Sequence, residues 1–356
     1  MEKLRKHNGK LYISGIFLVA LLALTFLYLF SEFDAAAIFK NISQANFSFL
    51  SLGFFMVILY LLCYGLFART LLNSLGTKTS LFKGFLYAGI DFYNSAITPS
   101  ASGGQPLVIY YMAKDGIPTS QASFSTLLHT AVFKAVLLFI NIFAMIFCFD
   151  SVVESGPLFV VLLFIGLAFN VFIISICLLS MFKKSATKKA GLWTIKFLSK
   201  IKIMKKADER CAAFEKVLDE YQDAAKFIKT HKLLFLRLFL IVLVQRTAFF
   251  SIAYIAYRSM GLSGYGYFYF LSIQALISLA VDSLPLPGGI GVNEAAIILT
   301  LQSTFGSAER AASGMLLIRS INYYFCLIIC SIASISVQLY HSFKRKKQNG
   351  NVIKNA

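Results

Sequence analysis

The stretch Asp282–Glu294, DSLPLPGGIGVNE, decides the fold. It contains two prolines and three glycines within seven residues, a composition that cannot continue an α-helix. The segments on either side, Tyr265–Val281 and Ala295–Leu301, are strongly apolar and look like membrane helix. A broken backbone inside a bilayer has to line a cavity enclosed by protein, because lipid cannot satisfy the freed N–H and C=O groups. The stretch therefore predicts a broken membrane helix bordered by two carboxylates.

A second break of the same kind lies far upstream. Residues Pro99–Pro106 read PSASGGQP, and the polar residues Asp91 and Asn94 precede them in an apolar segment. Buried carboxylates are expensive in a membrane and usually serve a function. We interpret the rest of the chain as a scaffold around these two breaks.

The composition identifies a polytopic membrane protein. Of 356 residues, 58% are hydrophobic and only 14% are charged, whereas a soluble domain is about 45–50% apolar and about 25% charged. A spanning helix needs about 20 apolar residues. Six segments meet this requirement as full spans, the first of them as a signal anchor: Leu11–Phe30, Leu50–Phe67, Ser123–Phe149, Leu158–Met181, Leu233–Tyr257 and Ala311–Tyr340.

The distribution of Lys and Arg predicts the orientation. Most of the 34 basic residues lie in short segments between apolar runs, which reports membrane orientation and not nucleic-acid binding. The N-terminus, the loop Lys183–Lys232 and the C-terminal tail are basic and are expected in the cytoplasm. The cation-poor loops Ser31–Phe49, Asp150–Gly156 and Arg258–Gly264 are expected outside.

This orientation makes the two broken segments enter from opposite sides. The segments before and after each break are assigned to the same side of the membrane. Phe82–Met112 therefore enters from the cytoplasm and returns to it, whereas Tyr265–Leu301 enters from outside and returns there. Two opposed re-entrant hairpins suggest an inverted repeat, which many alternating-access transporters contain. The alternative makes each hairpin two full spans and gives ten helices. The short halves of the first hairpin favour the re-entrant interpretation.

The predicted fold class is an all-α integral membrane protein with about six full transmembrane helices, two opposed re-entrant broken-helix hairpins and cytoplasmic termini. The domain organisation is a polytopic membrane domain over residues 1–343, with a basic cytoplasmic loop at 182–232, and a basic cytoplasmic tail at 344–356. Within the loop, Asp208–Lys229 has the period of an amphipathic helix. We expect it to connect the spans while lying on the anionic lipids of the inner leaflet, in preference to binding a partner protein.

Several charged side chains fall inside the predicted bilayer. Internal salt bridges that hold the bundle together explain any one of them, but a polar cavity better explains a set gathered around two breaks. The charges are Asp91, Lys134, Arg246, Asp282, Glu294 and Arg319. The candidate substrate-binding or cavity residues are Asp91, Asn94, Gly103, Gly104, Gln105, Arg246, Asp282, Gly288, Gly289, Gly291, Asn293, Glu294 and Arg319.

The chemistry of this set favours an anionic ligand. A helix that restarts after Gly104 or Gly289 would point its N-terminal N–H groups into the cavity and favour an anion there. Arg246 and Arg319 would add fixed positive charge suited to phosphate. The acidic residues could pair with these arginines, or bind a proton or a cation.

Alanine at Gly65, within an ordinary span, is expected to have little effect on transport.

The sequence predicts no catalytic residue, metal site or cofactor. No His, Cys or Glu at ligand spacing accompanies His129. Ser100 and Ser102 lack a paired His or Asp, so a nucleophile has no support.

The two broken segments resemble a known family. Pro99 and Gly103–Pro106 with Gly116, and Pro287–Glu294 with Arg319, resemble the flippase-like membrane domain of lysylphosphatidylglycerol synthases (the multiple peptide resistance factor) and its stand-alone relatives. Asn293 stands where many relatives carry Arg. Full-length members append a soluble domain that transfers lysine from lysyl-tRNA to phosphatidylglycerol. We expect a stand-alone member without that domain.

The resemblance implies a bacterial lipid translocase of the cell (plasma or inner) membrane. Its substrate would be an anionic or aminoacylated phospholipid or a polyprenyl-phosphate lipid, and a separate synthase protein could be its partner. One alternative is the membrane part of a phosphatidylglycerol lysyltransferase, which would act in lysylphosphatidylglycerol synthesis and in resistance to cationic peptide antibiotics. The others are an ion-coupled carrier of a small solute and a scaffold for envelope enzymes.

Overall fold

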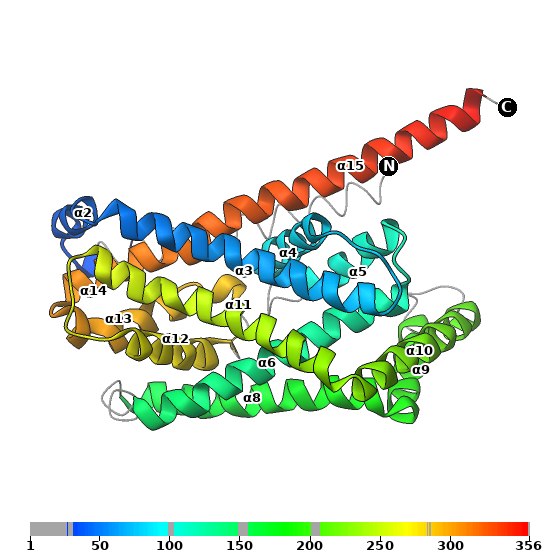
Figure 1. Ribbon diagram of the computed structural model, residues 1–356, viewed down its shortest axis with the longest axis horizontal. Coiled ribbons are helices and arrows are strands. Elements are labelled where there is room, and N and C mark those ends of the chain that lie inside the picture. Colours follow the sequence, from blue (N-terminus) through cyan, green and yellow to red (C-terminus); the bar gives the residue numbers. More distant parts are fainter. Residues whose placement is uncertain are drawn as a thin grey trace.

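The computed structural model is all-helical over the residues that it describes, which are 27, 31–98, 103–148, 156–200, 207–282, 284 and 286–354. The predicted span Leu11–Phe30, except for Leu27, and residues 99–102 of the first break lie outside this part of the chain. The elements, shown in Figure 1, are α2 (Ala35–Ser43), α3 (Phe47–Ser74), α4 (Leu81–Ala96), α5 (Gly104–Lys114), α6 (Thr119–Phe147), α8 (Pro157–Phe182), α9 (Lys184–Lys200), α10 (Ala207–Thr230), α11 (Lys232–Ser259), α12 (Tyr267–Val281), η2 (Pro287–Gly289), α13 (Val292–Phe305), α14 (Ala308–Arg319), η3 (Ser320–Phe325) and α15 (Cys326–Lys354).

Five helical runs are long and apolar enough to cross a membrane. Helices α3, α6, α8 and α11 coincide with four predicted spans, and at 1.5 Å per residue each is roughly 40 Å long. The fifth run, Ala308–Lys344, contains the predicted span Ala311–Tyr340. It is not one α-helix, because the π-helical segment η3 separates α14 from α15. These helices make the chain a multi-pass membrane protein.

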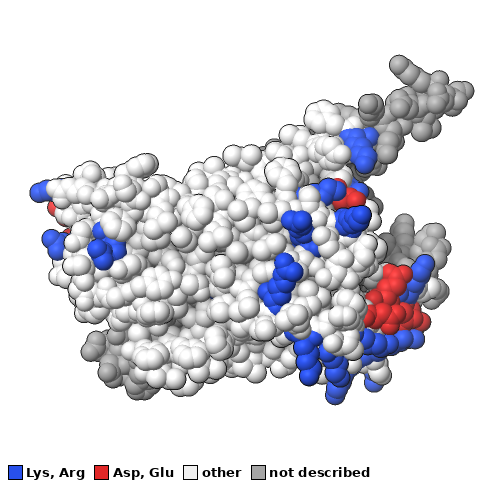
Figure 2. All heavy atoms as spheres, viewed as in Figure 1, with Lys and Arg blue, Asp and Glu red and all other residues white. Residues whose placement is uncertain are grey.

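The outer surface of the bundle suits a lipid environment. Of the five runs, α8 has the smallest share of its residues buried inside the protein, and its side chains Phe164 and Phe172 are exposed. On the face drawn in Figure 2, charged side chains gather at the two ends of the molecule and leave an uncharged middle. More Lys and Arg gather at the end that carries α9 and α10. A soluble protein of this size would not expose so much contiguous apolar surface.

The long helices α3 and α11 form an antiparallel pair at the centre of the bundle. At one end, the Asn46 N–H that precedes α3 donates to the Ser259 carbonyl that closes α11 (2.7 Å). Midway, the Gln245 side-chain amide donates to the Tyr60 carbonyl (3.3 Å). Since Tyr60 and Gln245 each lie at the middle of their helix, the pair is in register from end to middle.

The first broken segment folds into a helical hairpin, α4–α5. The Tyr87 hydroxyl on the second turn of α4 donates to the Asp115 carboxylate just after α5 (2.7 Å). Lys83 forms an ion pair with the same carboxylate (3.7 Å). The segment therefore ends beside the place where it begins, at the end of the bundle where His341 of α15 also contacts Asp115 (3.2 Å).

The second broken segment, α12–η2–α13, forms a hairpin that opens at the other end of the bundle. The hydroxyls of Tyr269 near the start of α12 and Thr304 near the end of α13 lie 3.1 Å apart. The loop before α12 is tied to the end of α11 through a hydrogen bond from the Gly264 N–H to the Tyr257 hydroxyl (2.8 Å). In Figure 1, α12 and α13 accordingly lie toward the left end and α4 and α5 toward the right.

The end of α4 meets the second break inside the bundle. A buried cluster joins Ala96 and Ile97 at the end of α4 to Ile290 of the second break and Tyr323 of η3. The four halves are 11 to 16 residues long, and a full span needs about 20. The short halves that the sequence predicts are therefore present in the structure.

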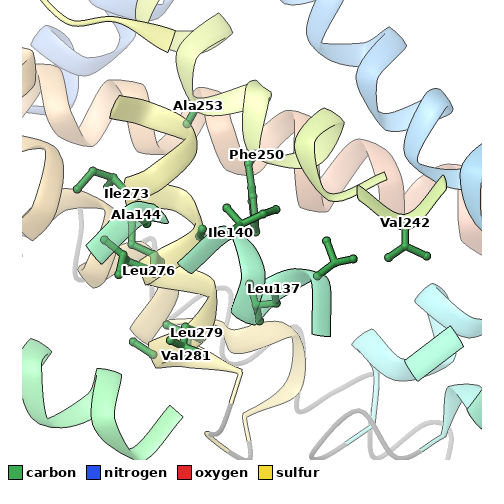
Figure 3. Close-up of a cluster of buried hydrophobic side chains, with 14 of the residues drawn as sticks. Leu137, Ile140, Ala144, Val242, Phe250, Ala253, Ile273, Leu276, Leu279 and Val281 are labelled. Atoms are coloured by element: carbon green, nitrogen blue, oxygen red, sulfur yellow. The ribbon is translucent and has the colours of Figure 1, made fainter. Parts of the chain in front are cut away.

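A close-packed apolar cluster fixes the second hairpin against the long helices. Figure 3 shows Leu137, Ile140 and Ala144 of α6 facing Ile273 and Leu276 of α12, beside Phe250 and Ala253 of α11. The cluster runs along α12 to Leu279 and Val281, directly before the break. Burial of large aliphatic and aromatic side chains stabilises such packing by about 1.5–3 kcal/mol each in water. In lipid, shape-matched contacts take over much of this role.

The predicted amphipathic helix exists as α10, but its apolar face packs against the protein. Leu218, Tyr221 and Ala225 are buried in the main core, and the Ser120 hydroxyl at the start of α6 donates to Glu220 (2.7 Å). On the other side, Lys184 of α9 pairs with Asp219 (2.5 Å), and this hydrogen bond lowers the pKa of the Asp219 carboxyl. The apolar face of this helix is therefore covered by protein, and the contact of the loop with anionic lipids of the inner leaflet stays a prediction.

The two glycines where α3 and α4 touch leave no room for a side chain. A Cβ added at Gly65 would lie 2.7 Å from the Phe85 nitrogen, and one at Gly84 would lie 2.5 Å from the Gly65 carbonyl oxygen. Backbone atoms of a packed helix cannot move aside as a side-chain end can. The expectation that alanine does little at Gly65 is therefore wrong.

We predict that Gly65→Ala destabilises the protein by about 1–3 kcal/mol, because overpacking forces α3 and α4 apart. The measurement is thermal unfolding of the purified protein in detergent. Gly266→Ala is the matched control, since a Cβ there meets no atom within 4 Å. Equal melting temperatures for the two variants would contradict the close contact between the helices.

The orientation can be tested by labelling single cysteines in cells. Cysteine at Ser43 should react with an impermeant thiol reagent added outside, whereas cysteines at Ser185 or Ser342 should react only after permeabilisation. All three serines are exposed, so burial does not confound the result. The background carries Cys211→Ser, because the other five native cysteines are buried. Labelling of Ser185→Cys in intact cells would contradict the predicted orientation.

Candidate functional site

A buried ion pair holds the second break together. The Arg319 Nε donates to Glu294 Oε1 (2.6 Å), and both side chains are at most 4% exposed. The other carboxylate oxygen, Oε2, accepts the Gly291 N–H (2.7 Å). Arg319 also donates to the Gly288 carbonyl (3.3 Å). The pair therefore satisfies backbone groups that the break leaves without helical partners.

Three glycines of this break adopt backbone conformations that other residues rarely take. Gly288, Gly289 and Gly291 have φ of 61°, 64° and 88°. A Cβ on Gly288 would also overlap the Tyr323 hydroxyl, and the Tyr323 ring stacks beneath the Arg319 guanidinium at 4.2 Å. The backbone thus approaches an aromatic ring and a cation at a distance that only glycine permits.

The N-terminus of α13 has an internal contact at its capping residue. The helix that restarts after the break begins at Val292, and its capping residue Gly291 donates to the Glu294 carboxylate of the same helix turn. Because this internal carboxylate occupies the N–H group, that position does not supply an open anion site. Asn293, in between, is half-buried on the first turn of α13.

The first break brings a buried carboxylate against a glycine. A Cβ on Gly104, the first residue of α5, would overlap the Asp91 carboxylate and the Ser95 hydroxyl of α4. The Tyr64 hydroxyl of α3 forms a hydrogen bond with Asp91. The Gly103 N–H donates to the Thr98 hydroxyl (2.9 Å). Unlike the second break, this one needs its glycines for space, because neither Gly103 nor Gly104 has a positive φ.

Two further predicted residues of the first hairpin bind neighbouring helices. The buried Asn94 amide donates to the Ile90 carbonyl (2.7 Å) and to the Ser334 hydroxyl of α15 (3.3 Å). The Gln105 amide donates to the Thr130 hydroxyl of α6 (2.7 Å). These contacts position α4 and α5 and do not place either amide with the charged residues of the second break.

A second ionic cluster lies at the start of the second break, directly after α12. Lys134 of α6 donates to Asp282 Oδ2 (2.9 Å), and the Ser278 hydroxyl lies 3.5 Å from Oδ1 of the same carboxylate. Ser278 accepts a hydrogen bond from the Arg246 guanidinium of α11 (2.8 Å). The order across the cluster is therefore Arg246, Ser278, Asp282, Lys134.

The charged residues lie at the middle of the long helices. Arg246 is at the midpoint of α11 and Lys134 is next to the midpoint of α6. Tyr60, at the midpoint of α3, has its hydroxyl within electrostatic range of both Arg246 and Asp91. If the long helices span a bilayer, this level is the centre of the hydrocarbon, where substrate sites of secondary transporters lie.

The structure therefore divides the predicted site residues into three groups. Glu294, Arg319 and the glycines close the second break, Arg246 and Asp282 form the central cluster, and Asp91 lies against Gly104 at the first break. Sequence reasoning left Tyr60, Tyr64 and Tyr323 out of the site. Ser278 could have been found, because it precedes Asp282 by one helical turn. Nothing in the sequence distinguishes the three tyrosines from the other aromatic residues of the spans.

The closing role of Glu294 and Arg319 gives a stability prediction. Arg319→Met leaves a buried carboxylate without its partner, so we expect a loss of about 3–5 kcal/mol. The measurement is thermal unfolding in detergent, and the control is Arg310→Met on the same helix, where the arginine is exposed. The pair of substitutions Glu294→Leu with Arg319→Met should recover part of the loss. An Arg319→Met protein as stable as Arg310→Met would contradict this role.

Comparison with known proteins agrees with this architecture. Residues 13–330 match the family described as the lysylphosphatidylglycerol synthase TM region. A UPF0104 membrane protein from Archaeoglobus fulgidus is 25% identical over 291 residues, which cover 78% of this chain and 81% of the relative. The family match spans both broken segments and ends five residues into α15. This chain therefore belongs to the lysylphosphatidylglycerol synthase transmembrane-region family and is a multi-pass membrane protein.

Proposed function

We propose that the protein is a lipid translocase of the cell membrane, which moves an anionic or aminoacylated phospholipid or a polyprenyl-phosphate lipid between leaflets. The observation that carries this proposal is the meeting of two broken hairpins beside a charged centre at mid-helix level. Bare charges at that depth cost several kcal/mol each unless they serve a cavity or a partner. A polar headgroup has to pass this same level when a lipid changes leaflet.

The packing of the helices supports an inverted repeat. In the first half α4 packs against α3 and against α15, and in the second half α12 packs against α11 and against α6. Each hairpin therefore lies between the long helix that precedes it and a long helix of the other half. The antiparallel α3–α11 pair, joined from Asn46 to Ser259, gives the two halves opposite directions.

Opposed hairpins offer a mechanism for alternating access. We infer that each is re-entrant, with the first opening toward the cytoplasm and the second toward the outside. A rocking movement of one half against the other would expose the central charges to one leaflet and then to the other. The headgroup would pass through the protein while the acyl chains remain in the surrounding lipid.

The test is lipid exchange in reconstituted vesicles. Purified protein should accelerate the movement of fluorescent phosphatidylglycerol between leaflets, measured as the fraction quenched by an external reductant. Gly288→Ala should slow this movement at least tenfold, because the added methyl combines an unfavourable φ with an overlap on Tyr323.

The control is Gly76→Ala. Gly76 also has a positive φ (86°), but a Cβ there meets no atom within 4 Å and the residue lies in the α3–α4 loop. Exchange no faster than in protein-free vesicles would contradict translocation. Ion-dependent uptake of a small solute without lipid exchange would support the carrier alternative, and formation of lysylphosphatidylglycerol from lysyl-tRNA would support the transferase alternative.

A further inference from the structure

Arg246 is a buried cation with unused hydrogen-bonding capacity. The residue is 4% exposed, and its guanidinium carbon lies 4.0 Å from the centroid of the Phe133 ring and 4.7 Å from that of the Phe250 ring. One terminal nitrogen donates to Ser278, but the Nε–H has no hydrogen-bond partner among the residues that the structure describes. A buried N–H without an acceptor is unfavourable, because it has lost its hydrogen bonds to water. Its retention points to an acceptor that arrives with a ligand.

Two aromatic rings, Phe133 and Phe250, pack against this cation. A guanidinium donates hydrogen bonds only from its edge, in the plane of its N–H groups. That edge carries the bond to Ser278 and faces the cluster in which Asp282 and Lys134 lie. The arginine is therefore held ready to bind an oxyanion in the plane of its N–H groups.

The charges of the cluster do not cancel. Two cations, Arg246 and Lys134, share one carboxylate, Asp282, and the arginine reaches that carboxylate only through Ser278. In the part of the chain that the structure describes, Arg246 forms no direct ion pair. One additional negative charge would make the cluster neutral, and a neutral cluster is the least costly at the centre of a bilayer.

The two ion pairs of the second hairpin differ in exposure. The side chains of Glu294 and Arg319 are at most 4% exposed, whereas Lys134 is 14% and Asp282 is 30% exposed. A ligand can therefore reach the Lys134–Asp282 pair without unpacking the protein. A carboxylate that is one-third uncovered can also leave its lysine when a competing anion arrives.

We propose that Arg246 and Lys134 bind the phosphodiester of a glycerophospholipid headgroup, with Asp282 as the exchangeable counter-ion of Lys134. The proposal rests on the proposed function and names its substrate class. A phosphodiester carries a single negative charge, the amount that neutralises the cluster. A polyprenyl diphosphate carries more charge than the cluster can balance. The phosphate oxygens of the phosphodiester would accept hydrogen bonds from the Arg246 Nε–H and from the Lys134 ammonium.

The test is equilibrium binding of radiolabelled phosphatidylglycerol to the full-length purified protein in mixed micelles. Arg246→Gln and Lys134→Gln should each weaken binding about tenfold, the loss expected for one charge-assisted hydrogen bond. Asp282→Asn should strengthen binding, because it removes the competitor for Lys134. Arg237→Gln, an exposed arginine on the same helix, should change nothing.

The result for Asp282→Asn separates the proposal from a purely structural ion pair. If Asp282 only holds the fold, Asp282→Asn should weaken binding as much as Lys134→Gln does, and that outcome would overturn the proposal. The double substitution Lys134→Gln with Asp282→Asn removes both partners of the pair at once. It should bind at least tenfold more weakly than Asp282→Asn alone, and equal binding would also overturn the proposal.

Two further measurements define the ligand and the function. Inorganic phosphate and the deacylated headgroup, glycerophosphoglycerol, should compete at least a hundredfold less well than the lipid, and equal competition would assign the site to a free anion instead. Binding that follows the predicted pattern without lipid exchange in vesicles would uphold the site and overturn the translocase. Lipid exchange together with unchanged binding in the variants would uphold the translocase and overturn the site.

Discussion

The constraint on which this structure depends is that a backbone broken in hydrocarbon has to find polar partners inside the protein. The second break meets it with one ion pair, in which Glu294 accepts from Gly291 and Arg319 donates to the Gly288 carbonyl. Each member of the pair thus neutralises the other and also completes the backbone. Glycine at three positions with positive φ lets the chain turn within this small space. The tight tip in turn allows α4, η2 and η3 to meet in one buried cluster.

The two ion pairs of the second hairpin differ in exposure and in their contacts with the backbone. The Glu294–Arg319 pair is buried and hydrogen-bonded to the backbone, so removal of one partner leaves the other as an uncompensated buried charge. The Lys134–Asp282 pair is partly uncovered, joins two different helices and carries an unbalanced neighbour in Arg246. An ion pair that is partly uncovered is easier to exchange than a buried one, because each partner can find another contact without unpacking the protein.

Much of the fold was predictable because lipid imposes simple rules on sequence. Continuous apolar runs of spanning length identified α3, α6, α8 and α11, and clustered prolines and glycines located both breaks. Contacts between distant segments were not predictable. Lys134 and Asp282 were both visible as interior charges, yet nothing local to either residue indicates that they pair. The same limit applies to Gly65, whose neighbour on α4 is known only once the helices are packed.

The amphipathic helix shows a different limit of sequence patterns. A helix with one apolar face has the same period whether that face meets lipid or protein. Helix α10 buries Leu218, Tyr221 and Ala225 against the core, and its acidic residues pair with the lysines of α9. The period was therefore read correctly, whereas the surface that it covers depends on helices far away in the chain.

The π-helical segment η3 has a consequence for how this protein can change in evolution. Successive turns of a π-helix contain more residues than those of an α-helix, so η3 gives α14 and α15 a different rotation about the common axis from that of one continuous helix. Arg319, at its upstream edge, faces the break, while Cys326 and Cys330 downstream face α4. Removal of one residue from Ser320–Phe325 would turn one half against the other by about 100°. A change in the length of this segment would therefore separate Arg319 from the break or the two cysteines from their cluster.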